Sequence, residues 1–204
     1  GDAGAEDTKI VFDGNAQDFY IGLDDTDDDL KIGLGSAVGT TSHMVFTEDG
    51  EVTKPLNPFF NAISALQSNV TGDNTIYTVL FATENDDVGS NYNTSNGTFT
   101  APITGMYQFN AVVNCHGYSG NEVVQQMYFT TSNEGQAAYD QALHDAAVTN
   151  LYDAGDNGIT SFGASAAFQM DASDTIIVQF VANGTGAKTA DVGANSYFSG
   201  YLIS

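Results

Sequence analysis

The sequence predicts an all-β protein, and three observations carry that prediction. Apolar residues alternate with polar ones in short stretches, as at Phe19, Ile21 and Leu23, which is the period of a half-buried strand. Turn signals such as Asp49-Gly50 separate these stretches. The chain also holds 22 glycines and only 3 prolines, in keeping with short strands joined by tight turns. With 42% hydrophobic residues, these strands have enough apolar material for a core.

The charge of the chain excludes some classes of partner. It has 26 acidic residues against 4 basic ones, and its formal net charge is −22. Binding to a nucleic-acid backbone needs clustered basic residues, and anionic membranes repel a polyanion, so we expect neither partner. The sequence contains no run of 18 apolar residues, so we expect no insertion into a membrane. The charge is interpreted first as solubility in a saline medium, where salt screens like charges, and second as metal binding.

No catalytic motif is present, so we do not expect an enzyme. Cys115 is the single cysteine and cannot form an intrachain disulfide, so stability must come from packing or oligomerisation. We expect Cys115 to be a small buried hydrophobe. On a strand it points away from the adjacent His116, so the two cannot act as a dyad. His43, His116 and His144 lie outside metalloprotease and nucleophile motifs.

The first 56 residues predict a β-rich stalk or attachment segment. Strands are expected at 10–12, 19–23 and 30–34, and a hairpin at 43–54 with a type I′ turn at Asp49-Gly50. These short strands suggest no long apolar face, so one copy could hardly bury a core. They become plausible if three copies wrap together. Pro55 and Pro58 mark a boundary, because each interrupts a strand ladder, and the head is expected at 57–204.

The head predicts a series of strands. Apolar runs at 75–81, 106–115, 122–132, 159–170, 175–182 and 196–203 read as strands. The acidic stretch 84–96 has no apolar period and is interpreted as a surface connection. Residues 133–155 are ambiguous: their alanines favour a helix, whereas the family resemblance described below implies a strand, and we predict a strand with a loop.

Residues in two parts of the head carry a resemblance to a known family. Phe81, Asp87, Tyr92, Phe99, Gly105, Tyr107 and Phe109 occur at the spacings of one signature. This stretch resembles the signature of the complement one-q (C1q) globular head, within the tumour-necrosis-factor-like jelly-roll superfamily. The terminal stretch 193–202 resembles the terminal strand of the same family. Ala111 stands where the family has an aromatic residue, and the resemblance covers Pro58 to Ser204.

The resemblance implies a ten-stranded jelly-roll sandwich and a homotrimer with aromatic residues packed in the core and along the three-fold axis. The residues expected there are Phe81, Phe99, Tyr107, Phe109, Phe198 and Tyr201. The first segment is similar to the β-structured stalks of bacteriophage tail fibres and other virion appendages. The stretch 50–62 is similar to the junction in such proteins between a fibre and a complement one-q-like head.

A ligand surface is expected at the far tip of the head. In a jelly roll whose last strand returns to the stalk end, three loops around 116–121, 150–158 and 184–195 lie at the other end. Aromatic, amide and carboxylate side chains on loops are typical of carbohydrate or protein recognition. The candidate residues are Tyr118, Asn121, Tyr152, Asp153, Asp156, Asn157, Lys188 and Asp191.

Two acidic turns are candidate metal sites. Asp24, Asp25 and Asp27 lie in the densest acidic run, and carboxylates suit hard cations such as calcium. The spacing fits no EF-hand, and a solvated turn is the alternative interpretation. Asp153 and Asp156 form a second candidate, because members of the resembled family often hold calcium near the trimer apex. No cofactor is required, and calcium remains a candidate ligand.

These patterns predict a trimeric virion protein, located on the particle surface, whose head binds a host-surface glycan or protein and whose stalk contacts other virion proteins. Three weak contacts would add up to avidity. The first alternative is a trimeric capsid decoration or cement protein without host recognition. A secreted complement one-q-like binding module is the second, and a polysaccharide-degrading enzyme the third.

Overall fold

The computed structural model describes residues 4, 6–117, 124–143, 160–184 and 186–204. Strands and turns make up this part of the chain, without a helix, so the all-β prediction is confirmed. The chain divides into two compact units, Gly1–Asn57 and Pro58–Ser204. The sequence predicted the boundary between residues 56 and 57, one residue before the division between Asn57 and Pro58. We call the first unit the N-terminal sheet and the second the head.

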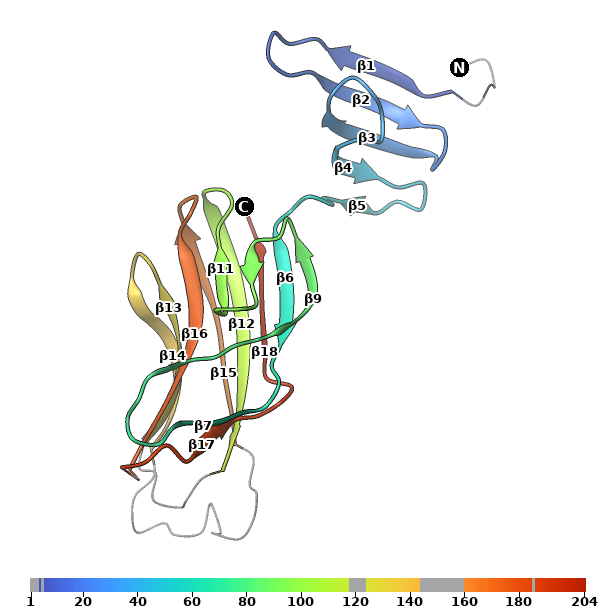
Figure 1. Cartoon of the computed structure of the whole chain (residues 1–204). Coiled ribbons are helices and arrows are strands. Elements are labelled where there is room, and N and C mark those ends of the chain that lie inside the picture. Colours follow the sequence, from blue (N-terminus) through green and yellow to red (C-terminus); the bar gives the residue numbers. More distant parts are fainter. Residues whose placement is uncertain (1–3, 5, 118–123, 144–159, 185) are drawn as a thin grey trace. The chain divides into compact units, whose positions relative to one another are not determined.

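The N-terminal sheet is a five-stranded antiparallel meander (Figure 1). Its strands follow one another in chain order: β1 (Thr8–Phe12), β2 (Phe19–Asp24), β3 (Asp29–Leu34), β4 (Ser42–Phe46) and β5 (Val52–Thr53). The predicted hairpin forms β4 and β5, but the type I′ turn is wrong. Gly50 has a φ of 99° whereas Asp49 is not left-handed, and a type I′ turn needs both. A five-residue loop closed by the Thr47 N–H and the Glu51 carbonyl (2.9 Å) replaces it.

One face of this sheet is covered by the chain's own segment 35–41. The Tyr20 ring is fully buried on that face, and its hydroxyl accepts the Gly39 N–H at 3.1 Å. A Cβ at Gly33 would lie 2.5 Å from the Tyr20 hydroxyl oxygen, so the glycine makes room for the ring. The expectation that these strands present no long apolar face is wrong for the other side. The antiparallel register aligns the apolar residues of neighbouring strands on that side. This alignment cannot be seen when each strand is considered alone.

The head packs two antiparallel sheets (Figure 1). The first sheet has the order β7 (Gln67–Thr71), β17 (Ala190–Val192), β12 (Gly105–His116), β18 (Tyr197–Leu202), β6 (Phe59–Ile63) and β9 (Thr83–Val88), and β15 (Thr160–Met170) also pairs with β12. The second has the order β10 (Tyr92–Asn93), β11 (Thr98–Thr100), β16 (Thr175–Asn183), β13 (Val124–Thr131) and β14 (Gly135–Leu143), and β8 (Tyr77–Thr78) pairs with β16.

Some of the strand predictions differ from this topology, and of the strand predicted at 75–81 only the two residues of β8 form. The predicted count of ten is not confirmed, since the described part of the head has thirteen strands, four of only two or three residues. The strand predicted within 133–155 is present as β14, up to Leu143. The stretch 84–96 is more than a connection, because most of β9 and all of β10 lie in it. Strand β9 pairs along β6 through its backbone, so its polar side chains remain exposed and leave no apolar period.

Aromatic side chains fill the space between the two sheets. The Phe60 ring stacks on Tyr92 and on Phe99, with centroids 4.8 and 4.9 Å apart. Strand β12 alternates buried and half-buried residues along all twelve positions, and Cys115 is buried as predicted. Of the six aromatic residues predicted for the core or three-fold axis, five are fully buried inside one subunit: Phe81, Phe99, Tyr107, Phe109 and Phe198. The sixth, Tyr201, is 44% exposed and points away from this core.

The two ends of the head differ in what they carry. Strand β18 runs antiparallel to β6, and the Leu202 N–H donates to the Pro58 carbonyl at 3.0 Å. The start of the head and its C-terminus therefore lie together at one end (Figure 1). The other end holds the C-terminal end of β12 and the short strand β17. We call this second end the tip.

Candidate functional site

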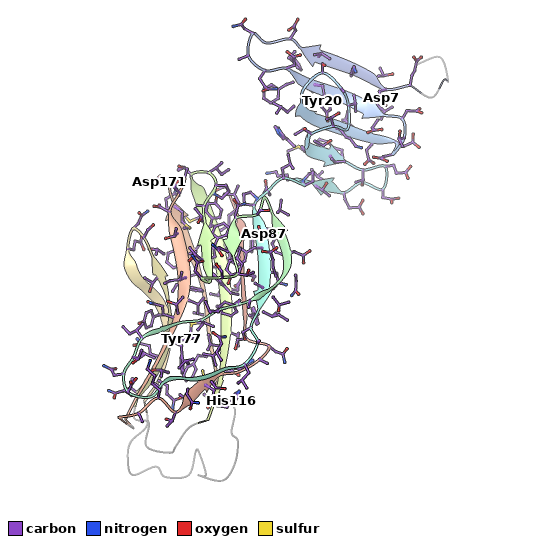
Figure 2. The ribbon with its side chains drawn as sticks, viewed as in Figure 1. Asp7, Tyr20, Tyr77, Asp87, His116 and Asp171 are labelled. Carbon is purple, nitrogen blue, oxygen red and sulfur yellow. The ribbon has the colours of Figure 1, made fainter. Side chains whose placement is uncertain are left out.

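The tip of the head is the candidate ligand site, and His116 lies in it. Figure 2 shows His116 at the opposite end of the head from Asp171. His116 is the last residue of β12 and pairs with Asp191 of β17. Because β12 alternates, the side chains of Asn114 and His116 lie on the face opposite Cys115. The regular strand β12 therefore places the Asn114 amide and the His116 imidazole at the tip.

A shallow hollow lies beside these two side chains. Asn114, His116, Gly193, Ala194 and Asn195 line it. A Cβ at Gly193 would approach the imidazole to 2.9 Å, so a glycine at this position lets the chain pass close to His116.

Hydrogen bonds to buried groups hold the wall of the hollow. The Gly193 N–H donates to the Asn114 carbonyl at 2.6 Å. The Gly193 carbonyl accepts from the hydroxyls of Ser64 (2.8 Å) and Ser196 (2.9 Å), and both serines are buried. The Ser196 hydroxyl in turn accepts the Asn114 N–H at 3.0 Å. The segment 193–195 is therefore fixed against β12 before any ligand arrives.

The polar groups of the tip suit recognition of a polar ligand. Nδ1 of His116 lies 3.7 Å from Oδ2 of Asp191, and Oδ1 of Asp191 accepts the Asn69 N–H at 2.6 Å. Amide, imidazole and carboxylate groups can donate and accept hydrogen bonds to a polar ligand. Among the described residues, no three His, Cys, Asp or Glu side chains are grouped so as to hold a metal ion.

Two of the eight predicted tip residues belong to the described part of the chain. Asp191 lies beside His116, which lines the hollow. Lys188 is exposed on the segment that precedes β17. The other six lie outside the described residues: Tyr118, Asn121, Tyr152, Asp153, Asp156 and Asn157. The prediction named neither Asn114 nor Asn195. Asn114 could have been found from the alternation of β12, because it shares a face with His116.

The acidic run in the N-terminal sheet is organised around a lysine. Nζ of Lys31 lies 2.7 Å from Oδ2 of Asp24 and 2.5 Å from Oδ2 of Asp27. The ammonium occupies the position between these carboxylates that a cation would need, and Asp25 joins no grouping of metal-binding residues in the described chain. The hydrogen bond from Lys31 lowers the pKa of Asp24, and the hydrogen bond to Asp24 raises the pKa of Lys31. The second predicted metal pair, Asp153 and Asp156, lies outside the described residues.

A second surface of the head is notable for its lack of charge. The outward positions of β6, β18, β12 and β15 contain neither lysine nor carboxylate, although the chain carries 26 acidic residues. Cross-strand register places Phe59, Tyr201, Gln108 and Ala167 in one row. The next row is Asn61, Ser199, Asn110 and Ser165, and the third is Ile63, Tyr197, Val112 and Gly163. We call this surface the neutral face.

Hydrogen bonds between neighbouring strands order the polar groups of the neutral face. Nε2 of Gln108 donates to the Ser165 hydroxyl at 3.0 Å, and that hydroxyl donates to Oδ1 of Asn110 at 2.8 Å. Tyr197 and Tyr201 are 39% and 44% exposed on the same face. A rigid, uncharged surface with exposed aromatic rings has the composition of a protein–protein interface core.

Comparison with protein families decides the classification of the head. The family model of the C1q domain matches residues 60–203. The chain belongs to the C1q domain family. The signature at 81–109 and the terminal strand at 193–202 both fall within the match. C1q-type domains are binding modules that typically assemble as homotrimers, and the jelly-roll prediction is confirmed.

Solved structures of the same fold are distant in sequence. The globular domain of a zebrafish complement 1qA protein is 15% identical, with a TM-score of 0.49, and the match covers 72% of this chain and 98% of that one. Murine APRIL at pH 5.0 is 9% identical, with a TM-score of 0.50, covering 72% of this chain and 99% of that one. A search of curated protein sequences gave no match. In the described part of the chain, no helix is long and apolar enough to cross a membrane.

Proposed function

We propose that this C1q-family chain is a non-catalytic trimeric binding module at the end of a virion fibre, and that the tip of its head binds a host-surface glycan or protein. The observation that carries the proposal is the hollow beside His116, held in place by buried serines at the end of a C1q head. The N-terminal sheet would connect the head to the other virion proteins.

Assembly through the neutral face is supported by the charge of the chain. Two copies that each carry a net charge of −22 repel one another over most of their surface. Contact through a face without lysine or carboxylate places no like charges at close range. The exposed rings of Tyr197, Tyr201 and Phe59 supply apolar area for it. The trimer typical of the family is therefore best accommodated by this face.

A neutral polar ligand suits the groups at the tip. Asn114 and Asn195 offer amides that both donate and accept hydrogen bonds, and sugar hydroxyls need both. An anionic ligand would meet the field of a strongly acidic protein, which disfavours phosphates and sulfates. Three tips in one trimer would bind a repeated surface glycan with avidity, so weak single-site contacts suffice.

A secreted C1q-like binding module without any virion is the second candidate, because the family match over residues 60–203 supports it equally. The two candidates share the trimer and the tip site and differ in where the protein resides. Labelling intact particles with an antibody raised against the head distinguishes them. Label at fibre ends supports the virion role. Label over the whole capsid supports a decoration protein, and protein found only in the medium supports the secreted module.

The tip site is tested by substituting one side chain from each of the two segments that line the hollow. We expect Asn195→Ala and His116→Ala each to weaken binding of the purified trimer to host cells or to an immobilised glycan panel by tenfold or more, because three sites lose a contact together. The matched control is Asn85→Ala, an exposed asparagine on β9. Unchanged binding of both tip variants, with an intact trimer, would show that the ligand binds elsewhere.

A further inference from the structure

The N-terminal sheet has a continuous apolar face that no other described residue of its own unit covers. Antiparallel register aligns its side chains in rows across the strands. The central row runs Ile10, Ile21, Ile32 and Met44. On one side lies the row Phe12, Phe19 and Leu34, and on the other the row Leu23, Leu30, Phe46 and Val52. We call these eleven residues the apolar face.

The apolar face is largely exposed, whereas the centre of the opposite face is covered. Ile10 is 63% exposed, Phe12 55% and Leu23 46%. On the other side, the segment 35–41 packs over Tyr20, and the ammonium of Lys31 is buried against its carboxylates. A sheet is stable in water when its apolar side packs against a second layer. The covered side already has its layer from the chain itself, and the apolar face lacks one.

The size of the apolar face indicates an interface. A fully exposed large apolar side chain presents about 200 Å², so the exposed fractions of these residues amount to roughly 800 Å² per copy. Exposed apolar patches on soluble monomers rarely exceed a few hundred Å². About 800 Å² on each partner is the size at which specific protein–protein interfaces become stable.

We propose that the apolar faces of three copies of this chain pack against one another and form a shared hydrophobic core in the N-terminal segment. The paired strand positions on this face carry neither lysine nor carboxylate, so copies can meet here without like-charge repulsion. The family's homotrimer supplies the number of copies. Only residues 54–58 join β5 to β6, so three heads in one trimer hold three N-terminal sheets at high local concentration.

This inference rests on the trimeric assembly in the proposed function, but on neither the ligand nor the virion. It also extends that function, because a shared core makes the N-terminal segment a permanent structural part of the trimer. The competing occupant is a different protein, for which the apolar face would be an attachment surface. Under that alternative, the apolar face is accessible to solvent in the purified trimer.

Thiol accessibility in the full-length protein tests the proposal. Ile21 and Val11 are each 36% exposed in the single chain, but Ile21 lies on the apolar face and Val11 on the opposite one. Ile21→Cys and Val11→Cys are therefore matched reporters, and the native Cys115 is buried. The rate of reaction with N-ethylmaleimide, a small neutral reagent, is measured for each variant and divided by the rate in the unfolded chain. The mass in solution is measured on the same samples.

We expect a trimeric mass for both variants and a reaction at least tenfold slower for Ile21→Cys than for Val11→Cys. A trimeric mass with equal rates overturns the shared core and leaves the proposed trimeric head intact. Equal rates in the trimer that become unequal only when a second virion protein is added also overturn it, in favour of a different occupant. A monomeric mass overturns the assembly in the proposed function itself.

Discussion

Among the described lysines, Lys31 alone has its ammonium buried between carboxylates. Its side chain is 9% exposed, that of Asp24 12% and that of Asp27 54%. Two acidic groups this close would repel each other without a cation between them. Lys31 of β3 supplies that cation, so its ion pairs stabilise the turn that holds the densest acidic run of the sequence. Its contribution to stability follows from the two pKa shifts.

We expect Lys31→Met to destabilise the N-terminal sheet by about 1–3 kcal/mol near neutral pH, because it leaves the buried Asp24 carboxylate without its partner. The pKa of Asp24 is lowered from 3.8 in the folded state, so its contribution is present above about pH 4 and is lost as pH falls through the lower folded value. The pKa of Lys31 is raised from 10.5, so its contribution is present below that pH and is lost as pH rises through the higher folded value.

The difference between wild type and Lys31→Met should therefore be level from about pH 5 to 9 and shrink below about pH 4. Urea unfolding followed by the NMR signals of β2 and β3 measures it, because the two units of the chain need not unfold together. Lys9→Met, at an exposed position, is the control and should change little. An equal loss from both substitutions would show that only net charge matters.

At the scale of elements, the turn between β9 and β10 shows how one carboxylate positions a strand. Oδ1 of Asp87 accepts the Asn91 N–H at 3.0 Å, and Oδ2 accepts the Tyr92 N–H at 2.8 Å. These bonds hold a turn in which Gly89 and Ser90 have positive φ angles of 94° and 56°. The turn places the Tyr92 ring flat against Phe60. The acidic position of the C1q signature therefore fixes a turn in this chain.

We expect Asp87→Ala to lower the free energy of unfolding of the head by about 1–2 kcal/mol, because two backbone N–H groups lose their acceptor. Asp86→Ala is the matched control, since the neighbouring carboxylate is exposed. It should be neutral or slightly stabilising in so acidic a chain. Urea denaturation followed by NMR signals of the head compares the two. Similar losses from both substitutions would contradict a turn-holding role.

Strands with an apolar period were predictable from the sequence, whereas features set by pairing were not. The apolar run at 106–115 predicted β12, and the small, apolar character of a free cysteine predicted the burial of Cys115. Strand β9 was missed because a polar edge strand is held by backbone bonds to β6, which leave no pattern in its side chains. Asn195 lies in the tip loop predicted at 184–195 but was not named among its candidate residues. Its place beside Asn114 depends on a fold that brings together residues about eighty positions apart.

For the whole molecule, charge and apolar surface act in opposite directions. Each copy carries −22, so a trimer carries three times that, or −66. Repulsion of this size opposes association, and the neutral face and the apolar face are where contact costs least. Salt shortens the reach of the repulsion from about 30 Å at 0.01 M to about 3 Å at 1 M. The apolar contacts persist under that change, so added salt should favour the assembled state.

We expect the melting temperature of the trimer to rise by several degrees between 10 mM and 500 mM NaCl, and its dissociation on dilution to decrease, because screening removes repulsion while burial remains. Differential scanning calorimetry and sedimentation velocity measure the two effects. Calcium chloride provides the decisive comparison. If charge is only screened, calcium acts according to its ionic strength. A melting temperature that rises and saturates at millimolar calcium would instead show a specific cation site, such as the one predicted at Asp153 and Asp156. A melting temperature that falls with added salt would mean that attractive charge pairs, rather than apolar contacts, hold the copies together.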